Sequence, residues 1–210
     1  MSKTTIPTGG ITADAINGTL IADDAVSEEH LDATAITGTT ALAETPASTD
    51  ELLISDGGTL KRLDFTHIYN VPSFRATMGS DQNVAASYTK LTFDTETWDT
   101  AGAFDHSSNY RFTVPTGQTG KYLFTVFLNQ SGTSAQGANY HIVWYKNGSA
   151  THYHNANPTY GGNVSRFRVS STITASLSAD DYIEVYCNGS SGNFTVQGGT
   201  EWTGFKLIGV

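Results

Sequence analysis

The chain has 210 residues, of which 38% are hydrophobic and 15% are charged, and it contains 21 glycines, 3 tryptophans, 10 tyrosines and 10 phenylalanines. This composition predicts short strands joined by tight turns, and it fits a disordered chain or a helical bundle poorly. The net charge of -9 disfavours a nucleic-acid partner, and the single cysteine, Cys187, excludes an internal disulfide framework and a multi-cysteine zinc site.

The sequence gives no sign of a membrane span or a secretion signal. No apolar run approaches the ~20 residues that are needed to span a bilayer, and the start MSKTTIPTGG lacks the apolar core of a signal peptide. We therefore expect a soluble protein that is made in a cytoplasm and does not insert into a membrane.

Charge and aromatic residues are divided unevenly along the chain. Residues 1–70 carry three basic and eleven acidic side chains but only two aromatic rings, whereas residues 71–210 carry eight basic and nine acidic side chains and the other 21 rings. The N-terminal part has too little bulk for an ordinary core, while a part of about 140 residues can bury one. This step predicts a boundary near Val71-Pro72 and a head domain at residues 71–210.

From position 11 the chain repeats a ten-residue unit, which reads ITADAINGTL, IADDAVSEEH and LDATAITGTT in three copies. A unit this short cannot bury two large aliphatic side chains within its own chain, so these positions need neighbours that cover them. We expect copies of the chain to do so around a common axis, which makes residues 1–47 an N-terminal anchor and a trimerising stalk. The aliphatic positions of this predicted seam are Ile11, Ile16, Ile21, Val26, Leu31 and Ile36.

A disordered tether, in which alanine, threonine and aspartate dominate by composition, is the alternative for this region. Within the stalk interpretation, short helical turns and an extended chain with little regular structure both stay open.

Residues 48–70 are predicted to form a hairpin, or neck, before the head. Within residues 48–63, two short stretches that contain apolar residues flank an Asp56-Gly57-Gly58 turn. The decapeptide repeats, followed by the segment DELLISDGGTLKRLD, resemble the stalks of phage tail fibres and related virion proteins. This resemblance implies a bacteriophage virion protein.

After residue 85 the sequence alternates between apolar and polar residues in segments separated by turn signals such as Asn147-Gly148 and Asn188-Gly189. The predicted strands are 88–93, 110–114, 121–128, 140–145, 165–173, 181–187, 193–196 and 202–208. Eight or more short strands without convincing helices between them predict an all-β antiparallel sandwich, and a two-sheet jelly roll suits this length.

The aromatic spacing of the head is similar to the signature of the C1q and tumour-necrosis-factor jelly roll. The chain reads Phe93, five residues, Asp99, four residues, Phe104, seven residues, Phe112, seven residues and then Gly120-Lys121-Tyr122-Leu123-Phe124. The ending Trp202-Thr203-Gly204-Phe205-Lys206-Leu207 is similar to the last strand of that family. The last two spacers are longer than in the family pattern, by one and two residues, and both insertions fall in predicted turns, where they cost little. The resemblance covers residues 74–210 and implies a C1q-like head that packs as a homotrimer.

The polar and aromatic segment that follows the strand at 140–145 is the predicted receptor-binding loop. Aromatic rings stack on sugar faces while Asn and His side chains donate and accept hydrogen bonds, which suits a saccharide receptor. An ordinary surface loop is the alternative. The predicted contact residues are Trp144, Tyr145, Asn147, His152, Tyr153, His154, Asn155 and Tyr160.

His152 and His154 stand two residues apart in the predicted polar loop 151–162, so in an extended segment both imidazoles project to the same side. Three such pairs on the axis of a trimer would offer six nitrogen ligands to a transition metal. The alternative is an exposed aromatic loop tip without a metal. No other cofactor is expected.

The sequence does not predict an enzyme. Cys187 falls on the inward side of a predicted strand, which makes it a buried structural thiol. The acid pair Asp180-Asp181 is better explained by a turn, and Asp94 with Glu96 by a loop at 94–99, than by glycoside hydrolysis.

The sequence therefore predicts a homotrimeric structural protein of a bacteriophage virion, made in the host cytoplasm and exposed on the particle surface. As a tail fibre or receptor-binding protein, it would join other virion proteins through its N-terminus and attach to a host cell-surface glycan through its head. A head fibre or a capsid decoration protein is the alternative, because the first ten residues suit either attachment.

Overall fold

A computed structural model describes residues 21, 26, 30, 33–69, 71–134, 140–156, 164–189 and 194–207. The chain divides into two units, Met1–Asp50 and Glu51–Val210. No helix within the described ranges has the length and apolar character of a membrane span.

The described part of the first unit contains one short helix, α1 (Thr34–Thr37). Two positions of the predicted seam are described there, and the side chains of Ile21 and Val26 are 41% and 57% exposed. The other seam positions, Ile11, Ile16, Leu31 and the side chain of Ile36, lie outside the described residues. The trimerising stalk therefore stays a prediction.

The second unit begins with the predicted hairpin, in which β1 (Glu51–Asp56) pairs antiparallel with β2 (Thr59–Asp64). Gly57 and Gly58 have φ angles of 58° and 85°. Positive φ at both central residues is the geometry of a type I′ hairpin turn, which glycine adopts without strain. The short helix α2 (Thr66–Tyr69) follows the hairpin.

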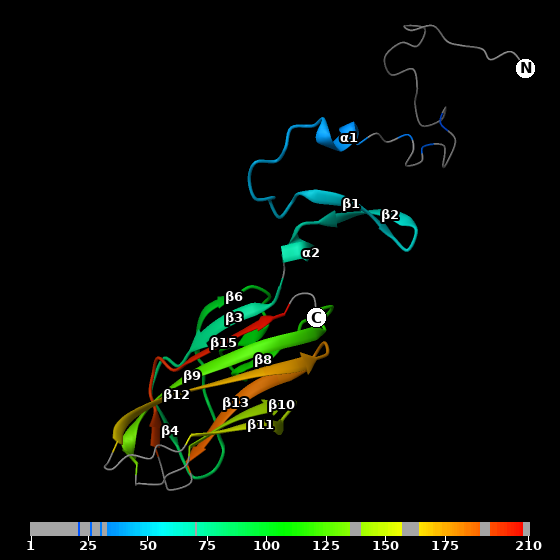
Figure 1. Cartoon of the computed structure of the whole chain (residues 1–210). Helices are drawn as coiled ribbons and strands as arrows, with labels where there is room; N and C mark the ends of the chain where they lie inside the picture. The colour runs from blue at the N-terminus through cyan, green and yellow to red at the C-terminus, as the bar shows by residue number, and fades with distance from the viewer. Residues whose placement is uncertain are drawn as a thin grey trace, which may run out of the picture. The chain divides into compact units, whose positions relative to one another are not determined.

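The rest of the second unit is a sandwich of two antiparallel sheets (Figure 1). The 7-stranded sheet, called the β9 sheet below, has the order β4-β14-β9-β15-β3-β6. β14 and β15 pair with successive parts of β9, and β12 also pairs with β9. Its strands are β3 (Ser73–Thr77), β4 (Gln82–Val84), β6 (Thr95–Asp99), β9 (Gly120–Ser134), β12 (Val164–Leu177), β14 (Phe194–Val196) and β15 (Glu201–Lys206).

The 6-stranded sheet, called the β10 sheet, has the order β11-β10-β13-β8-β7, and β5 also pairs with β13. Its strands are β5 (Thr89–Lys90), β7 (Phe104–Asp105), β8 (Arg111–Thr113), β10 (Tyr140–Lys146), β11 (Ser149–Ala156) and β13 (Tyr182–Gly189).

The long strands pass between the sheets in jelly-roll order. The chain crosses from β9 to β10 and β11, returns at β12, crosses again to β13 and returns to β14 and β15. The resulting strand orders β12-β9-β15-β3 and β11-β10-β13-β8 face each other. The all-β antiparallel jelly-roll sandwich is thus confirmed, and each of the eight segments predicted as strands overlaps one.

Aromatic side chains fill the space between the two sheets. Phe74 stacks on Phe104 with ring centroids 4.6 Å apart, and the indole of Trp202 meets Phe74 edge-on at 5.1 Å. The aromatic residues of the signature are all buried in this core: Phe93, Phe104, Phe112, Tyr122 and Phe124. Cys187 is buried there too, and burial raises the pKa of its thiol well above the ordinary range, so it is a structural thiol.

Two segments predicted as loops are strands. β6 occupies the predicted loop 94–99, and β11 occupies the first part of the predicted loop 151–162. Both strands lie at an edge of their sheet. An edge strand tolerates polar side chains on its exposed positions, so the alternation that reveals a central strand is weak there.

Candidate functional site

Four tyrosines gather on the outer face of the β10 sheet, which points away from the core. Alternate residues of β10 and β13 enter the core, and this leaves Val143, Tyr145 and Tyr186 on the outer face. Tyr153 of β11 and Tyr186 of β13 are the ladder partners of Val143 on its two sides. We call Tyr88, Tyr145, Tyr153 and Tyr186 the tyrosine cluster.

The rings of the cluster contact one another in two pairs. Tyr145 lies against Tyr186 with ring centroids 4.0 Å apart and an interplanar angle of 31°. Tyr88, which precedes β5, meets Tyr153 edge to face at 6.4 Å. Val143 is 0% exposed although it points away from the core, since it lies between Tyr153 and Tyr186. The cluster is therefore a packed aromatic surface and not a set of separate side chains.

An ion pair lies beside the cluster. Glu184, the ladder partner of Tyr145, is buried and accepts a hydrogen bond from the ammonium group of Lys90. Burial, followed by the charges of Tyr153, Tyr88 and Glu184, raises the pKa of Tyr145. Burial, followed by Glu184 and its tyrosine neighbours, also raises the pKa of Tyr186. Both hydroxyls consequently stay protonated at neutral pH and can donate hydrogen bonds.

The structure brings part of the predicted receptor-binding set into this cluster. Tyr145 and Tyr153 belong to it, and Asn155 projects from the same side of β11 as Tyr153 because the two are two residues apart. Tyr88 and Tyr186 were not predicted as contact residues. The period of two along the predicted strand 181–187 places Tyr186 opposite the inward Cys187, whereas no sequence signal connects Tyr88 with residues 145 and 153.

Two predicted contact residues have structural roles. Trp144 is 0% exposed, and its indole Nε1–H donates to Ser171 Oγ at 2.8 Å inside the sandwich. Asn147 lies in the turn between β10 and β11, where its Nδ2 donates to Asp181 Oδ1 at 2.7 Å and its Oδ1 accepts from the Tyr182 N–H at 2.8 Å. The prediction of receptor contact was wrong for Trp144 because its side of β10 is the core side. For Asn147, which is exposed, receptor contact stays a prediction, since each end of its amide makes only one of the hydrogen bonds that it can form.

His152 and His154 project from the side of β11 opposite Tyr153. Their ladder partners are Trp144 and Ile142, so they face the open edge of the sandwich between β11 and β12. His152 lines a cavity of about 200 Å³ there, together with Lys146, Thr151, Ile173, Thr174, Ala175, Ser176 and Ile183. The two histidines are therefore separated from the tyrosine cluster by the strand itself.

The predicted metal site at His152 and His154 stays a prediction. Among the described residues, no group of three or more His, Cys, Asp or Glu side chains gathers as a metal site would require. A trimer axis could still collect imidazoles from three chains. Tyr160, the remaining predicted contact residue, lies outside the described residues.

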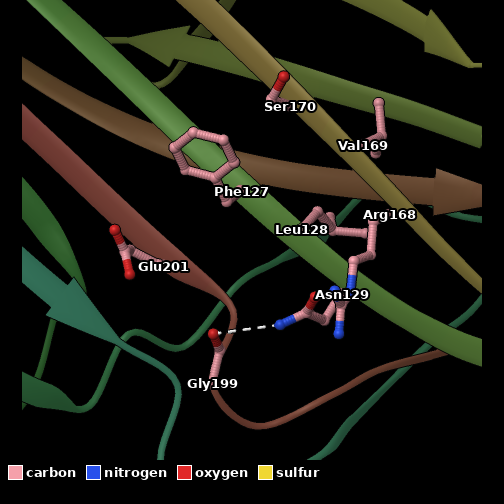
Figure 2. Close-up of a pocket in the computed structure, with 8 residues that line it drawn as sticks. All are labelled: Phe127, Leu128, Asn129, Arg168, Val169, Ser170, Gly199 and Glu201. Carbon is pink, nitrogen blue, oxygen red and sulfur yellow. Dashed lines mark hydrogen bonds between the residues drawn. The ribbon is translucent and has the colours of Figure 1, made fainter.

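The outer face of the β9 sheet is a second candidate surface. Phe127 of β9 and Phe205 of β15 point away from the core and are 54% and 44% exposed. Beside Phe127 the surface is hollowed into a pocket of about 490 Å³ between β9, β12 and the turn before β15 (Figure 2). Arg168 and Glu201 are the charged residues that line it.

No family model matches the chain, and no curated protein matches it. Among solved structures, the chain is similar to Eiger TNF from S. frugiperda, with a TM-score of 0.49, 12% identity and coverage of 67% of this chain and 93% of that one. It is also similar to the globular domain of zebrafish complement 1qA protein, with a TM-score of 0.46, 15% identity and coverage of 65% of this chain and 98% of that one. For murine APRIL at pH 5.0 the TM-score is 0.48 and the identity 11%, with coverage of 65% of this chain and 99% of that one.

Proposed function

We propose that the chain is a homotrimeric attachment protein of a bacteriophage virion, a tail fibre or receptor-binding protein whose head binds a glycan on the host surface. The tyrosine cluster is the observation that carries this proposal. Tyr153 and Tyr88 are 58% and 41% exposed, so ring surface is available to a ligand. Aromatic rings that are rigidly packed on a sheet offer a stacking surface for sugar rings at low cost in conformational entropy.

The outer face of the β9 sheet supports assembly of the head. Next to Phe127 and Phe205, this face carries mainly threonine and serine side chains, such as Thr125, Thr172 and Thr203. Of its charged residues, Glu201 is paired with Arg75, and Arg168 lines the pocket beside Phe127. Exposed aromatic rings on a face that is otherwise rich in small polar side chains are typical of a surface that another protein chain covers.

Three heads joined in this way would raise the affinity of a weak glycan site by multivalency. The resemblance of the decapeptide repeats and the DELLISDGGTLKRLD segment to phage fibre stalks supports the assignment to a virion. In this proposal residues 1–47 anchor the protein to other virion proteins, and the tyrosine cluster does the binding. The protein is proposed to have no enzymatic activity and no cofactor.

The test is binding of the purified full chain to an array of bacterial surface polysaccharides and oligosaccharides. We expect the chain to bind some of them, and Tyr153→Ser to lose this binding. Tyr153→Phe is the matched variant and should retain it, because it keeps the ring and removes only the hydroxyl. The proposed attachment site would be refuted if the wild-type chain bound no glycan, or if the Tyr153→Ser variant bound glycans as well as the wild type does.

A further inference from the structure

We propose that the ligand of the tyrosine cluster is an uncharged pyranose, which stacks on the ring of Tyr153, touches the neighbouring ring of Tyr88 at its side and is held at its hydroxyls by Asn155. This inference rests on the proposed function, because it names the class of glycan that the same face binds. It follows from the arrangement of the rings, from a polar side chain next to them, and from the charges on this face.

The rings form a platform and not a cage. The ring centroids of Tyr145 and Tyr186 are 4.0 Å apart. Those of Tyr88 and Tyr153 are 6.4 Å apart, and these two rings meet edge to face. Neither pair leaves room between its rings for a cationic group, which is what an aromatic cage for an ammonium ligand needs. The exposed ring surface belongs mainly to Tyr153 and Tyr88. A pyranose presents a flat patch of C–H bonds about the size of one aromatic ring, so it fits this surface.

Asn155 supplies the polar contact next to the platform. It is exposed, projects from β11 on the side of Tyr153 and lies beside His141 in the β10–β11 ladder. Within the part of the chain that the structure describes, no hydrogen bond engages its side chain. An amide can donate to one hydroxyl and accept from another. Neighbouring hydroxyls on a sugar ring match this pairing.

The charges on this face argue against an acidic sugar. Lys90 is paired with the buried Glu184, whereas Lys146 lies on the other side of β10, in the cavity beside His152, and is paired there with Asp181 at 2.8 Å. Arg111 lies over the ring of Tyr182, 4.2 Å from its centroid. Tyr182 is four residues before Tyr186, so this guanidinium is displaced by about 13 Å along β13. A carboxylate on the platform would lose hydration without gaining an unpaired lysine or arginine beside it, which is unfavourable.

The experiment uses saturation-transfer NMR to measure binding of small glycosides to the full chain. The key pair is methyl β-D-glucopyranoside and methyl β-D-glucopyranosiduronic acid, which differ only by the carboxylate at C6. The methyl glycosides of galactose, mannose and N-acetylglucosamine complete the neutral set. Protein variants are Tyr153→Ser, Tyr88→Ser and Asn155→Ala, with Tyr153→Phe and Tyr88→Phe as matched controls that keep each ring.

We expect at least one neutral glycoside to receive saturation at its ring C–H protons, with the glucuronide bound about ten-fold more weakly than the glucoside. Both serine variants should lose the signal, both phenylalanine variants should keep it, and Asn155→Ala should weaken it. A glucuronide that binds as well as the glucoside, or better, overturns the inference. The inference is also overturned if no neutral glycoside receives saturation while the chain binds acidic glycans on the array. That result would leave the proposed function intact. A chain that binds no glycan at all overturns the proposed function itself.

Discussion

Trp144 of β10 donates its indole N–H to the hydroxyl of Ser171 in β12, at 2.8 Å, and both residues are buried. The bond connects the two sheets across the core, where neither group has water as an alternative partner. The rings of Phe124 and Trp202 lie 6.3 Å and 6.0 Å from that of Trp144, so the indole is also part of the aromatic core. Trp144 thus stabilises the sandwich and does not contact a receptor.

Trp144→Phe should lower the free energy of unfolding by about 2–4 kcal/mol, because it removes buried volume and leaves the Ser171 hydroxyl without its donor. Urea unfolding followed by circular dichroism measures this loss. Trp98→Phe is the control, since Trp98 is 44% exposed and should change stability little. Glycan binding by folded Trp144→Phe should be unchanged, and a selective loss of binding would contradict the structural role.

Gly204→Ala should destabilise the head by about 1–3 kcal/mol through overpacking. A Cβ atom at Gly204 would lie 2.6 Å from Phe74 Cε1 and closer still to the ring of Phe124. Both rings are fully buried in the core, so they have little room to move. Gly120→Ala is the matched control, because its added Cβ meets the flexible end of the Lys206 side chain. Equal thermal midpoints for the two variants would disagree with this packing.

Phe127→Asp should weaken self-association if the outer face of the β9 sheet forms the contact between heads. A desolvated carboxylate in that contact would be unpaired and costly. Light scattering on the full chain, over a range of concentrations, should give three times 22.4 kDa for the wild type and a lower mass for the variant at low concentration. Tyr153→Asp places the same charge at a similarly exposed aromatic position on the other sheet, and it should remain trimeric. A monomeric wild type would refute assembly altogether.

Stability should depend on Asp181 at acidic pH. Hydrogen bonds from Lys146, Asn147 and the Ser178 N–H lower the pKa of Asp181 from 3.8 to about 2. Because the folded pKa lies below the unfolded one, the stabilisation is fully present above about pH 4 and is lost as the pH falls towards 2. Asp181→Asn should reduce stability at neutral pH and flatten its dependence on pH between 4 and 2.

The control for this pH dependence is Asp180→Asn, at the neighbouring exposed position. Asp180 has a positive φ of 69°, a conformation that asparagine also tolerates. Urea midpoints measured at several pH values should therefore follow the wild type for Asp180→Asn and diverge for Asp181→Asn. Parallel curves for both variants would show that Asp181 does not supply the acid-sensitive stabilisation.

The sequence alone was sufficient for the class of fold. Alternation in segments such as 121–128 and 181–187 reports the side of the strand on which each residue lies, because successive side chains of a strand point to opposite faces. This local rule predicted the sandwich, the buried Cys187 and the turn at Asn147-Gly148. It failed at β6 and β11, where the strand is an edge and solvent accepts polar residues on positions that a central strand would bury.

Only the tertiary structure decided which residues share a surface. Tyr88, Tyr153 and Tyr186 come from three separate segments, and the pairing of β11, β10, β13 and β5 brings them onto one face. The same pairing directs the side chain of Trp144 into the core, and it places His152 and His154 on the side of β11 opposite Tyr153. The period of two tells which residues share one face of a strand. Pairing between distant strands then decides which of the two faces is buried and which residues become its neighbours. That selection depends on packing between residues far apart in the chain, which no local pattern contains.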